Sequence, residues 1–154
     1  MQWQMEFNIG IEVIDDQHKR IVEYINELEE ILSDPFHTRE QVGDVLNNII
    51  DYTQSHFAFE ESLLAQANYP YMSPHKSVHE AFISKIEKYR QQFLAGTAIE
   101  KDLHKMLLKW LINHIQHDDA DYVASVKESM VNYIHKQEST KGKGWFSRFF
   151  GGRN

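Results

Sequence analysis

The chain contains no cysteine and few residues that interrupt helices, with three prolines and seven glycines among 154 residues. Without thiols there are no disulfides, and cysteine-ligated zinc sites and iron–sulfur clusters are excluded. No apolar run approaches the roughly 20 residues of a membrane-spanning helix, and no early segment resembles a secretory signal. We therefore expect a soluble cytoplasmic protein whose single domain buries enough apolar surface to fold without cross-links.

Basic residues are also scarce, since 16 lysines and arginines stand against 23 acids and give a formal net charge of −7. This balance argues against a body that binds nucleic acid. The exception is residues 141–154, where four basic residues and no acids give +4, so that residues 1–140 carry −11. Histidine, in contrast, is abundant, with nine in the chain.

Apolar residues recur at helical spacing in four long segments that are separated by short links. The first segment follows Asp15 and Asp16, either of which can cap it. The second opens with Thr38 and Gln41, which have the spacing of a capping box, and we expect this helix to run to about Gln66.

The third and fourth helices are predicted from similar signals at their ends. Ser73 as the cap and Pro74 at the first helical position predict the start of the third helix, and Gly96 predicts its end. Thr97 and Glu100 have the spacing of a second capping box, which opens the fourth helix.

The segments outside these helices complete the predicted fold. Residues 1–14 hold apolar side chains without a helical period and are expected to form an extended arm, whereas apolar positions in 122–133 indicate a short fifth helical segment. The pattern predicts an all-α fold: an up-down-up-down four-helix bundle with an extended N-terminal arm and a short C-terminal helix. We expect the bundle domain to comprise residues 1–138, followed by a basic aromatic tail at 139–154.

Histidines interrupt the apolar face of every predicted long helix, and on the second helix His56 is joined by Glu60 one turn later. The histidines in such positions are His18, His56, His75, His79 and His114. In an up-down bundle successive helices alternate in direction. The first turns of helices one and three therefore lie at the same level as the last turns of helices two and four. Imidazoles and a carboxylate buried together need partners, and this ligand set suits a pair of metal ions.

One more acidic ligand is expected near His114, and Asp118, Asp119 and Asp121 are all available there. Regular helix geometry favours Asp118, because Asp119 lies five residues after His114 and therefore about 140° further round the helix. Helical spacing alone thus favours Asp118 over Asp119 as the acidic ligand.

The ordered motifs match a known family over residues 1 to about 135. They are Trp3, Phe7, Gly10 and Asp15-x-Gln17-His18, then His56-x-x-x-Glu60-Glu61, then Tyr69-Pro70-x-x-x-x-His75-x-x-x-His79, and finally Trp110-Leu111-x-x-His114-Ile115-x-x-x-Asp119-x-x-Tyr122. This order resembles hemerythrin, specifically the single-domain bacteriohemerythrins. Because several separate motifs agree, the resemblance is specific.

The resemblance implies a non-haem centre of two iron ions with an oxo or hydroxo bridge, and O2 as its ligand. The implied ligands are His75, His79 and His114 for one iron, His18 and His56 for the other, and Glu60 and Asp119 as bridges. It thereby favours Asp119 over Asp118, which requires the fourth helix to bend or end soon after His114. It also implies an open position on the two-histidine iron. Spacing places five apolar side chains around that position: Ile21, Phe57, Trp110, Leu111 and Ile115.

Reversible O2 binding for storage, transport or delivery is therefore the leading expectation, in a monomeric protein that is not an enzyme beyond weak oxidase or peroxidase side activity. The alternatives are a di-iron oxidoreductase that removes peroxide or nitric oxide, and an O2 or redox sensor that acts through a partner. An oxidoreductase would need proton-delivering groups beside the open iron, and the apolar walls count against them. Ligand type alone leaves manganese and zinc open beside iron.

The tail carries a second, separate hypothesis. Trp145, Phe146, Phe149 and Phe150 would form one face of a short basic helix, which suits an anionic membrane surface or a protein partner. The alternatives are a tail without fixed structure and a segment packed back on the acidic body. The remaining histidines fall in links or on polar faces and are expected at the surface: His37, His104, His117 and His135.

Overall fold

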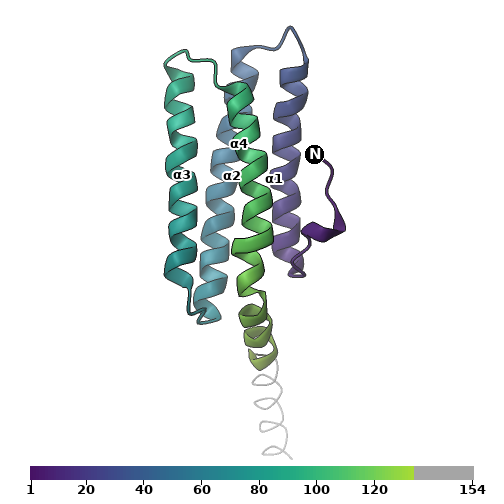
Figure 1. Cartoon of the computed structure of the whole chain (residues 1–154), viewed down its shortest axis with the longest axis vertical. Coiled ribbons are helices and arrows are strands. Elements are labelled where there is room, and N and C mark those ends of the chain that lie inside the picture. The colour runs from purple at the N-terminus through teal and green to yellow at the C-terminus, as the bar shows by residue number, and fades with distance from the viewer. Residues whose placement is uncertain (134–154) are drawn as a thin grey trace, which may run out of the picture.

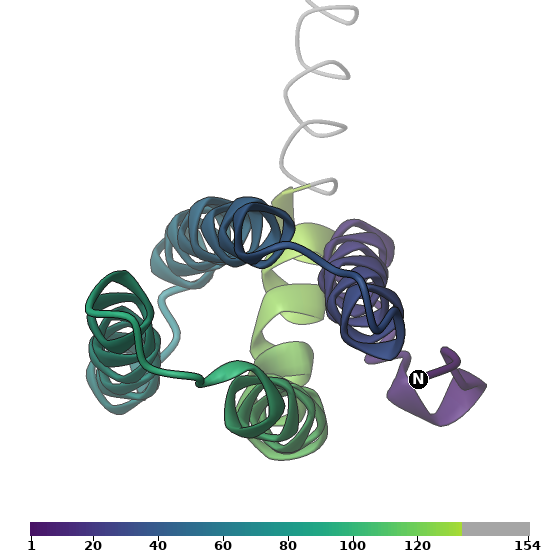
Figure 2. The same ribbon diagram turned by 90° about the horizontal axis from the view of Figure 1, so that it is seen from above.

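A computed structural model describes residues 1–133, so the predicted tail at 139–154 and His135 lie outside the described residues. Four long helices stand side by side in alternating directions, which confirms the predicted all-α bundle (Figure 1). They are α1 (Glu12–Ser33), α2 (Arg39–Gln66), α3 (Met72–Leu94) and α4 (Glu100–Asn113). Seen from above, the helices surround a shared interior (Figure 2), in which α1 packs against α2 and α4, and α2 packs against α3.

The N-terminal arm runs back along α1, as predicted, with one 3-10 turn at Met5–Phe7. The side chain of Phe7 is buried in the main core. At the start of the arm, the amide nitrogen of Asn26 donates to the Met1 carbonyl at 2.8 Å. The arm therefore covers one side of α1 without adding a strand to the described part of the chain.

The helix ends show which local signals the chain uses. The predicted capping box is present: the backbone nitrogen of Gln41 donates to Thr38 Oγ1 at 3.2 Å, and the Thr38 nitrogen donates to Gln41 Oε1 at 2.7 Å. The second predicted box was wrong, because α4 begins after Ile99 without a side-chain cap. The backbone nitrogen of Thr97 instead closes α3 by donating to the Gln92 carbonyl at 3.0 Å.

The predicted starts of α1 and α3 were also wrong. Asp15 lies inside the first turn of α1, where its carboxylate accepts from the backbone nitrogens of Ile9 at 2.8 Å and Gly10 at 3.1 Å. This carboxylate fixes the preceding turn, so the helix begins before it. α3 begins at Met72 without a side-chain cap, because the turn after buried Tyr69 closes directly onto Met72.

The chain continues beyond α4 as one connected helical segment. It passes through a π-helix at His114–Asp119 and a 3-10 turn at Ala120–Tyr122, and residues 123–133 are helical again. The predicted fifth segment is therefore present, but it continues from α4. Figure 2 shows this continuation crossing under one end of the bundle.

The continuation seals that end of the bundle with a second apolar cluster. Its fully buried members include Tyr122 and Val126, which pack with residues from the start of α1 and the end of α2. The main core fills the rest of the bundle. The layer between these two cores is where the predicted metal ligands lie. Among the described residues, no helix is long and apolar enough to cross a membrane.

Candidate metal centre

The structure brings all seven residues predicted as ligands into one buried layer. They come from the second turn of α1, the last third of α2, the start of α3 and the π-helix: His18, His56, Glu60, His75, His79, His114 and Asp119. The most exposed of them, His75, has only 5% of its surface accessible. Four helical segments thus meet at the level that bundle topology predicts.

Glu60 lies at the centre of this layer. Its Oε2 atom is 3.1 Å from His79 Nε2, 3.3 Å from His75 Nε2 and 3.7 Å from His114 Nε2. The same oxygen is 3.9 Å from His56 Nε2. One carboxylate oxygen therefore faces imidazoles from α2, α3 and the π-helix.

Asp119 approaches two histidines, one with each of its carboxylate oxygens. Its Oδ2 atom lies 3.0 Å from His18 Nε2, and its Oδ1 atom lies 3.2 Å from His114 Nε2. The two oxygens of one carboxylate thus face histidines on opposite sides. This is the arrangement that a bridging carboxylate needs.

The π-helix explains why Asp119 faces the layer despite its spacing. A π-helix repeats at i to i+5, so Asp119 comes one turn after His114 and on the same face. Asp118, which regular helix geometry favours, lies behind the His114 ring with its Oδ2 atom 3.4 Å from Nδ1. Periodicity could not reveal this local change of pitch.

Three of the histidines are fixed from behind by polar side chains. The Nδ1–H groups donate from His56 to Gln17 at 2.8 Å, from His79 to Glu61 at 3.1 Å and from His114 to Asp118 at 3.4 Å. A proton on Nδ1 leaves the lone pair of Nε2 free to bind a cation, and such partners also fix ring orientation. Sequence reasoning gave no supporting role to any of these three partners, although each directly adjoins a predicted ligand.

Several buried polar atoms of the site have no hydrogen-bond partner among the described residues. They are both ring nitrogens of His18, the Nε2 atoms of His56, His79 and His114, and both carboxylate oxygens of Asp119. Unpaired buried polar atoms are costly, and here they converge on one small volume. Two sets of ligand atoms lie close enough to hold a cation each, and Glu60 belongs to both. The donor set therefore fits two metal ions.

Burial keeps three of the imidazoles, those of His18, His56 and His114, in the neutral form that binds metal. It lowers the pKa of His56 to about 4, and it lowers the pKa values of His18 and His114, with smaller effects from neighbouring histidines. All three rings are thus neutral at pH 7.

The two carboxylates differ in the protein without metal. Burial acts to raise the pKa of Glu60, but hydrogen bonds with His75 and His79 bring it below its ordinary value. Burial and the charge of Glu60 raise the pKa of Asp119. Asp119 therefore holds a proton more readily than Glu60, so cations that bind at Asp119 compete with its protonation.

Tyr122 holds the remaining oxygen of Glu60. This fully buried tyrosine donates its hydroxyl proton to Glu60 Oε1, which leaves Oε2 directed at the histidines. Burial, followed by the charge of Glu60, raises the pKa of the phenol, so the proton stays on Tyr122. Sequence analysis placed Tyr122 in the family motif but assigned it no role.

Aromatic rings cover part of the histidine layer. Phe57 stacks on His79 with 3.8 Å between ring centroids, and Trp110 stacks on His114 at 4.6 Å. The other three predicted wall residues, Ile21, Leu111 and Ile115, are buried in the main core. Phe57 and Trp110 thus lie against the rings of His79 and His114.

Comparison with known proteins decides the family. The model of the Hemerythrin HHE cation binding domain matches residues 9–126. The chain belongs to the hemerythrin family. It is 44% identical over 153 residues to a bacteriohemerythrin of Stenotrophomonas maltophilia, with 97% of each chain covered. It is 30% identical to a myohemerythrin of Sipunculus nudus, covering 78% of this chain and 88% of that one.

A solved hemerythrin has the same fold. The wild-type crystal structure matches with a TM-score of 0.76 and 29% identity, covering 82% of this chain and 97% of the other. The hemerythrin family binds a di-iron centre, and the histidine and carboxylate cluster of this chain suits such a centre.

The other described histidines lie outside the hemerythrin cluster. His117 is exposed, as predicted. His37 and His104 are only partly exposed, and His104 Nε2 lies 4.0 Å from Glu29 on α1. His104, predicted at the surface, is thus only partly accessible, because its ring turns towards the neighbouring helix.

Proposed function

We propose that this protein binds O2 reversibly at a di-iron centre, for storage, transport or delivery of oxygen. In this proposal His75, His79 and His114 hold one iron, and His18 and His56 hold the other. The implied bridges between them are Glu60 and Asp119. The observation that carries the proposal is the convergence of five buried histidines and two buried carboxylates on one layer of the bundle.

The distances support this division of ligands. His75 and His79 both approach Oε2 of Glu60. The ring of His114 lies 5.2 Å from that of His79 between centroids, against 6.1 Å from that of His56 and 6.2 Å from that of His18. A ring nitrogen of His114 also lies within 4.8 Å of ligand atoms of His18 and His56, so this ring stands between the two groups. In this division the metal held by His18 and His56 would have one imidazole fewer than its neighbour. Iron held there would leave room for a small ligand and would supply the electrons that bind O2.

The surrounding residues favour binding over further chemistry. Ile21, Leu111 and Ile115 are almost completely buried and carry no group that transfers protons. The hydroxyl proton of Tyr122 is engaged by Glu60, and burial keeps it on the phenol. Exclusion of water and proton donors slows irreversible oxidation, which a carrier requires and a reductase does not.

The test is a spectroscopic O2 titration of protein loaded anaerobically with Fe2+. We expect a coloured species that forms with O2 and disappears when O2 is removed, over repeated cycles. Continuous consumption of added reductant without a reversible spectrum would contradict the proposal and support the oxidoreductase alternative.

Variants of two neighbouring isoleucines sharpen this test. Ile21→Ala opens space where the proposal places the O2 pocket, so we expect several-fold faster irreversible oxidation of the oxygenated protein. Ile25→Ala is the matched control, because Ile25 is equally buried one turn further along α1. Equal oxidation rates in both variants would remove Ile21 from the pocket.

A further inference from the structure

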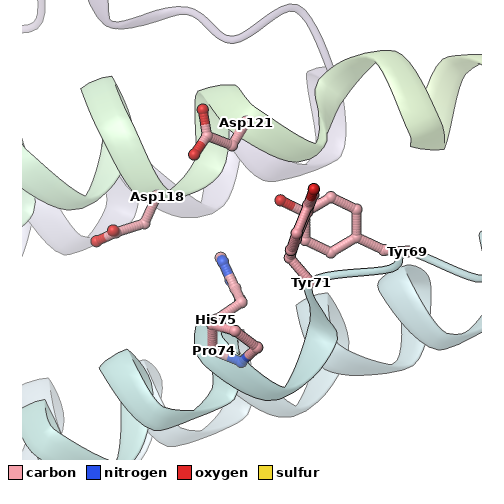
Figure 3. Close-up of a pocket in the computed structure, with 6 residues that line it drawn as sticks. All are labelled: Tyr69, Tyr71, Pro74, His75, Asp118 and Asp121. Atoms are coloured by element: carbon pink, nitrogen blue, oxygen red, sulfur yellow. The ribbon is translucent and has the colours of Figure 1, made fainter.

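A pocket opens beside the metal layer between the start of α3 and the π-helix. It has a volume of about 320 Å³ and is lined by Tyr69, Tyr71, Pro74, His75, Asp118 and Asp121 (Figure 3). One predicted ligand, His75, belongs to this lining. Figure 3 shows its imidazole directed towards the chain that carries Asp118 and Asp121. The pocket thus joins the outer surface to a ligand of the centre.

His75 differs from the other ligands of its side in how it is held. Its side chain is only 4% exposed, and its Nε2 atom lies 3.3 Å from Glu60. Its Nδ1 atom has no hydrogen-bond partner in the described part of the chain, whereas His79 and His114 are each fixed through Nδ1 by an acid. His75 also lies in the first turn of α3, where helices open most easily.

The rim of the pocket is acidic. Asp121 is exposed, the side chain of Asp118 is 23% exposed, and no lysine or arginine belongs to the lining. Two carboxylates beside the opening raise the local concentration of divalent cations. The opening therefore attracts the ions that the buried layer binds.

A second pocket reaches the centre at His79, but there the histidine is held in place. The lining of this pocket includes three acids, one of which is Glu80. There, however, His79 Nδ1 is held by Glu61, and the ring of Phe57 stacks on the imidazole at 3.8 Å. Glu61 is itself 3.6 Å from the ammonium group of Lys76. Movement of His79 would break its contacts with Glu61 and Phe57.

We propose that the pocket at His75 is the port through which divalent metal ions enter and leave the centre. Asp121 and Asp118 attract the hydrated ion at the rim. His75 turns outward from Glu60, takes the ion at its imidazole nitrogen and carries it inward as it returns. This inference concerns metal loading alone and does not depend on O2 binding.

The test compares two matched charge removals, Asp121→Asn and Glu80→Gln, in otherwise intact protein. Each variant removes one exposed carboxylate from a pocket that reaches a ligand. Metal-free protein is mixed anaerobically with Fe2+, and in a parallel series with Co2+, and bound metal is followed with time. We expect several-fold slower loading for Asp121→Asn and a wild-type rate for Glu80→Gln.

Two further measurements separate attraction at the rim from damage to the site. The final metal content of Asp121→Asn should equal that of the wild type, because Asp121 is not a ligand. Its rate defect should shrink as salt rises from about 0.01 M to about 1 M, which shortens the Debye length from roughly 30 Å to roughly 3 Å.

The following loading results overturn the proposal. Wild-type loading by Asp121→Asn, or slowed loading by Glu80→Gln alone, assigns entry to another route. A defect that persists at high salt, or a lower final metal content, assigns Asp121 a structural role. Failure of the O2 titration with normal loading kinetics would reject the proposed function while leaving the port in place.

Discussion

Asp118 and Asp119 are adjacent in sequence but serve the cluster in different ways. Asp119 turns both oxygens towards ligand histidines, while Asp118 supports the back of one ring. A side chain that bridges two cations contributes to both, whereas a supporting acid orients one ligand. The two residues therefore make a matched pair for mutation.

The first prediction concerns this pair. Asp119→Asn should reduce the bound metal to one ion per chain or fewer, because the neutral amide cannot replace a bridging carboxylate. Asp118→Asn should retain both ions with an affinity about 10- to 100-fold weaker. Metal analysis and competition with a chelator measure both effects. Equal losses in the two variants would contradict the roles assigned here.

Helix ends show why some elements were predictable and others were not. The Thr38 capping box involves residues three apart and depends on nothing distant, so sequence spacing was sufficient. Thr97 has the same local signal, but Gly96, with φ of +91°, ends α3 and commits the Thr97 backbone to that turn. The spacing of Thr97 and Glu100 alone does not reveal that Thr97 belongs to the end of α3 and does not cap α4.

The second prediction uses this contrast. Thr38→Ala should lower the free energy of unfolding by about 1 kcal/mol, because the first turn of α2 loses a side-chain acceptor. Thr97→Ala should change it by less than about 0.5 kcal/mol, since no side-chain cap is lost. Urea unfolding of both variants is the measurement. A comparable loss in Thr97→Ala would show that its hydroxyl caps α4 after all.

The metal layer was predictable to the extent that it followed from periodicity. His18, His56, Glu60, His75 and His79 lie on regular helices, and bundle topology brings them to one level. Asp119 needed the family resemblance, because a π-helix changes the local pitch. Gln17 and Glu61 were missed because their contacts lie on the outer side of the rings, where apolar periodicity carries no information.

At the scale of the whole molecule, the buried histidines couple folding to pH in the metal-free protein. Their pKa values are lowered by burial, to about 4 for His56, whereas in the unfolded chain they titrate near about 6.5. Between these pH values the unfolded state binds more protons, so stability falls as pH falls. The raised pKa of Asp119 has the opposite effect on stability. Three histidines with lowered pKa values outweigh this single carboxylate.

The third prediction follows from this balance. The metal-free protein should lose stability as pH falls from about 6.5 to about 4, and His56 alone contributes about 3 kcal/mol at the acid end. Urea unfolding of metal-free protein at neutral and acidic pH measures the slope. Stability that is constant or increases towards acid would show that the rings are not buried as neutral groups.

The whole bundle is arranged so that four helical segments support one pair of cations between two apolar cores. The most direct test is the number of iron ions per chain after anaerobic reconstitution with Fe2+ and removal of unbound metal. The ligand layer predicts two ions per chain. A content of one ion or fewer in the correctly folded wild-type protein would contradict it.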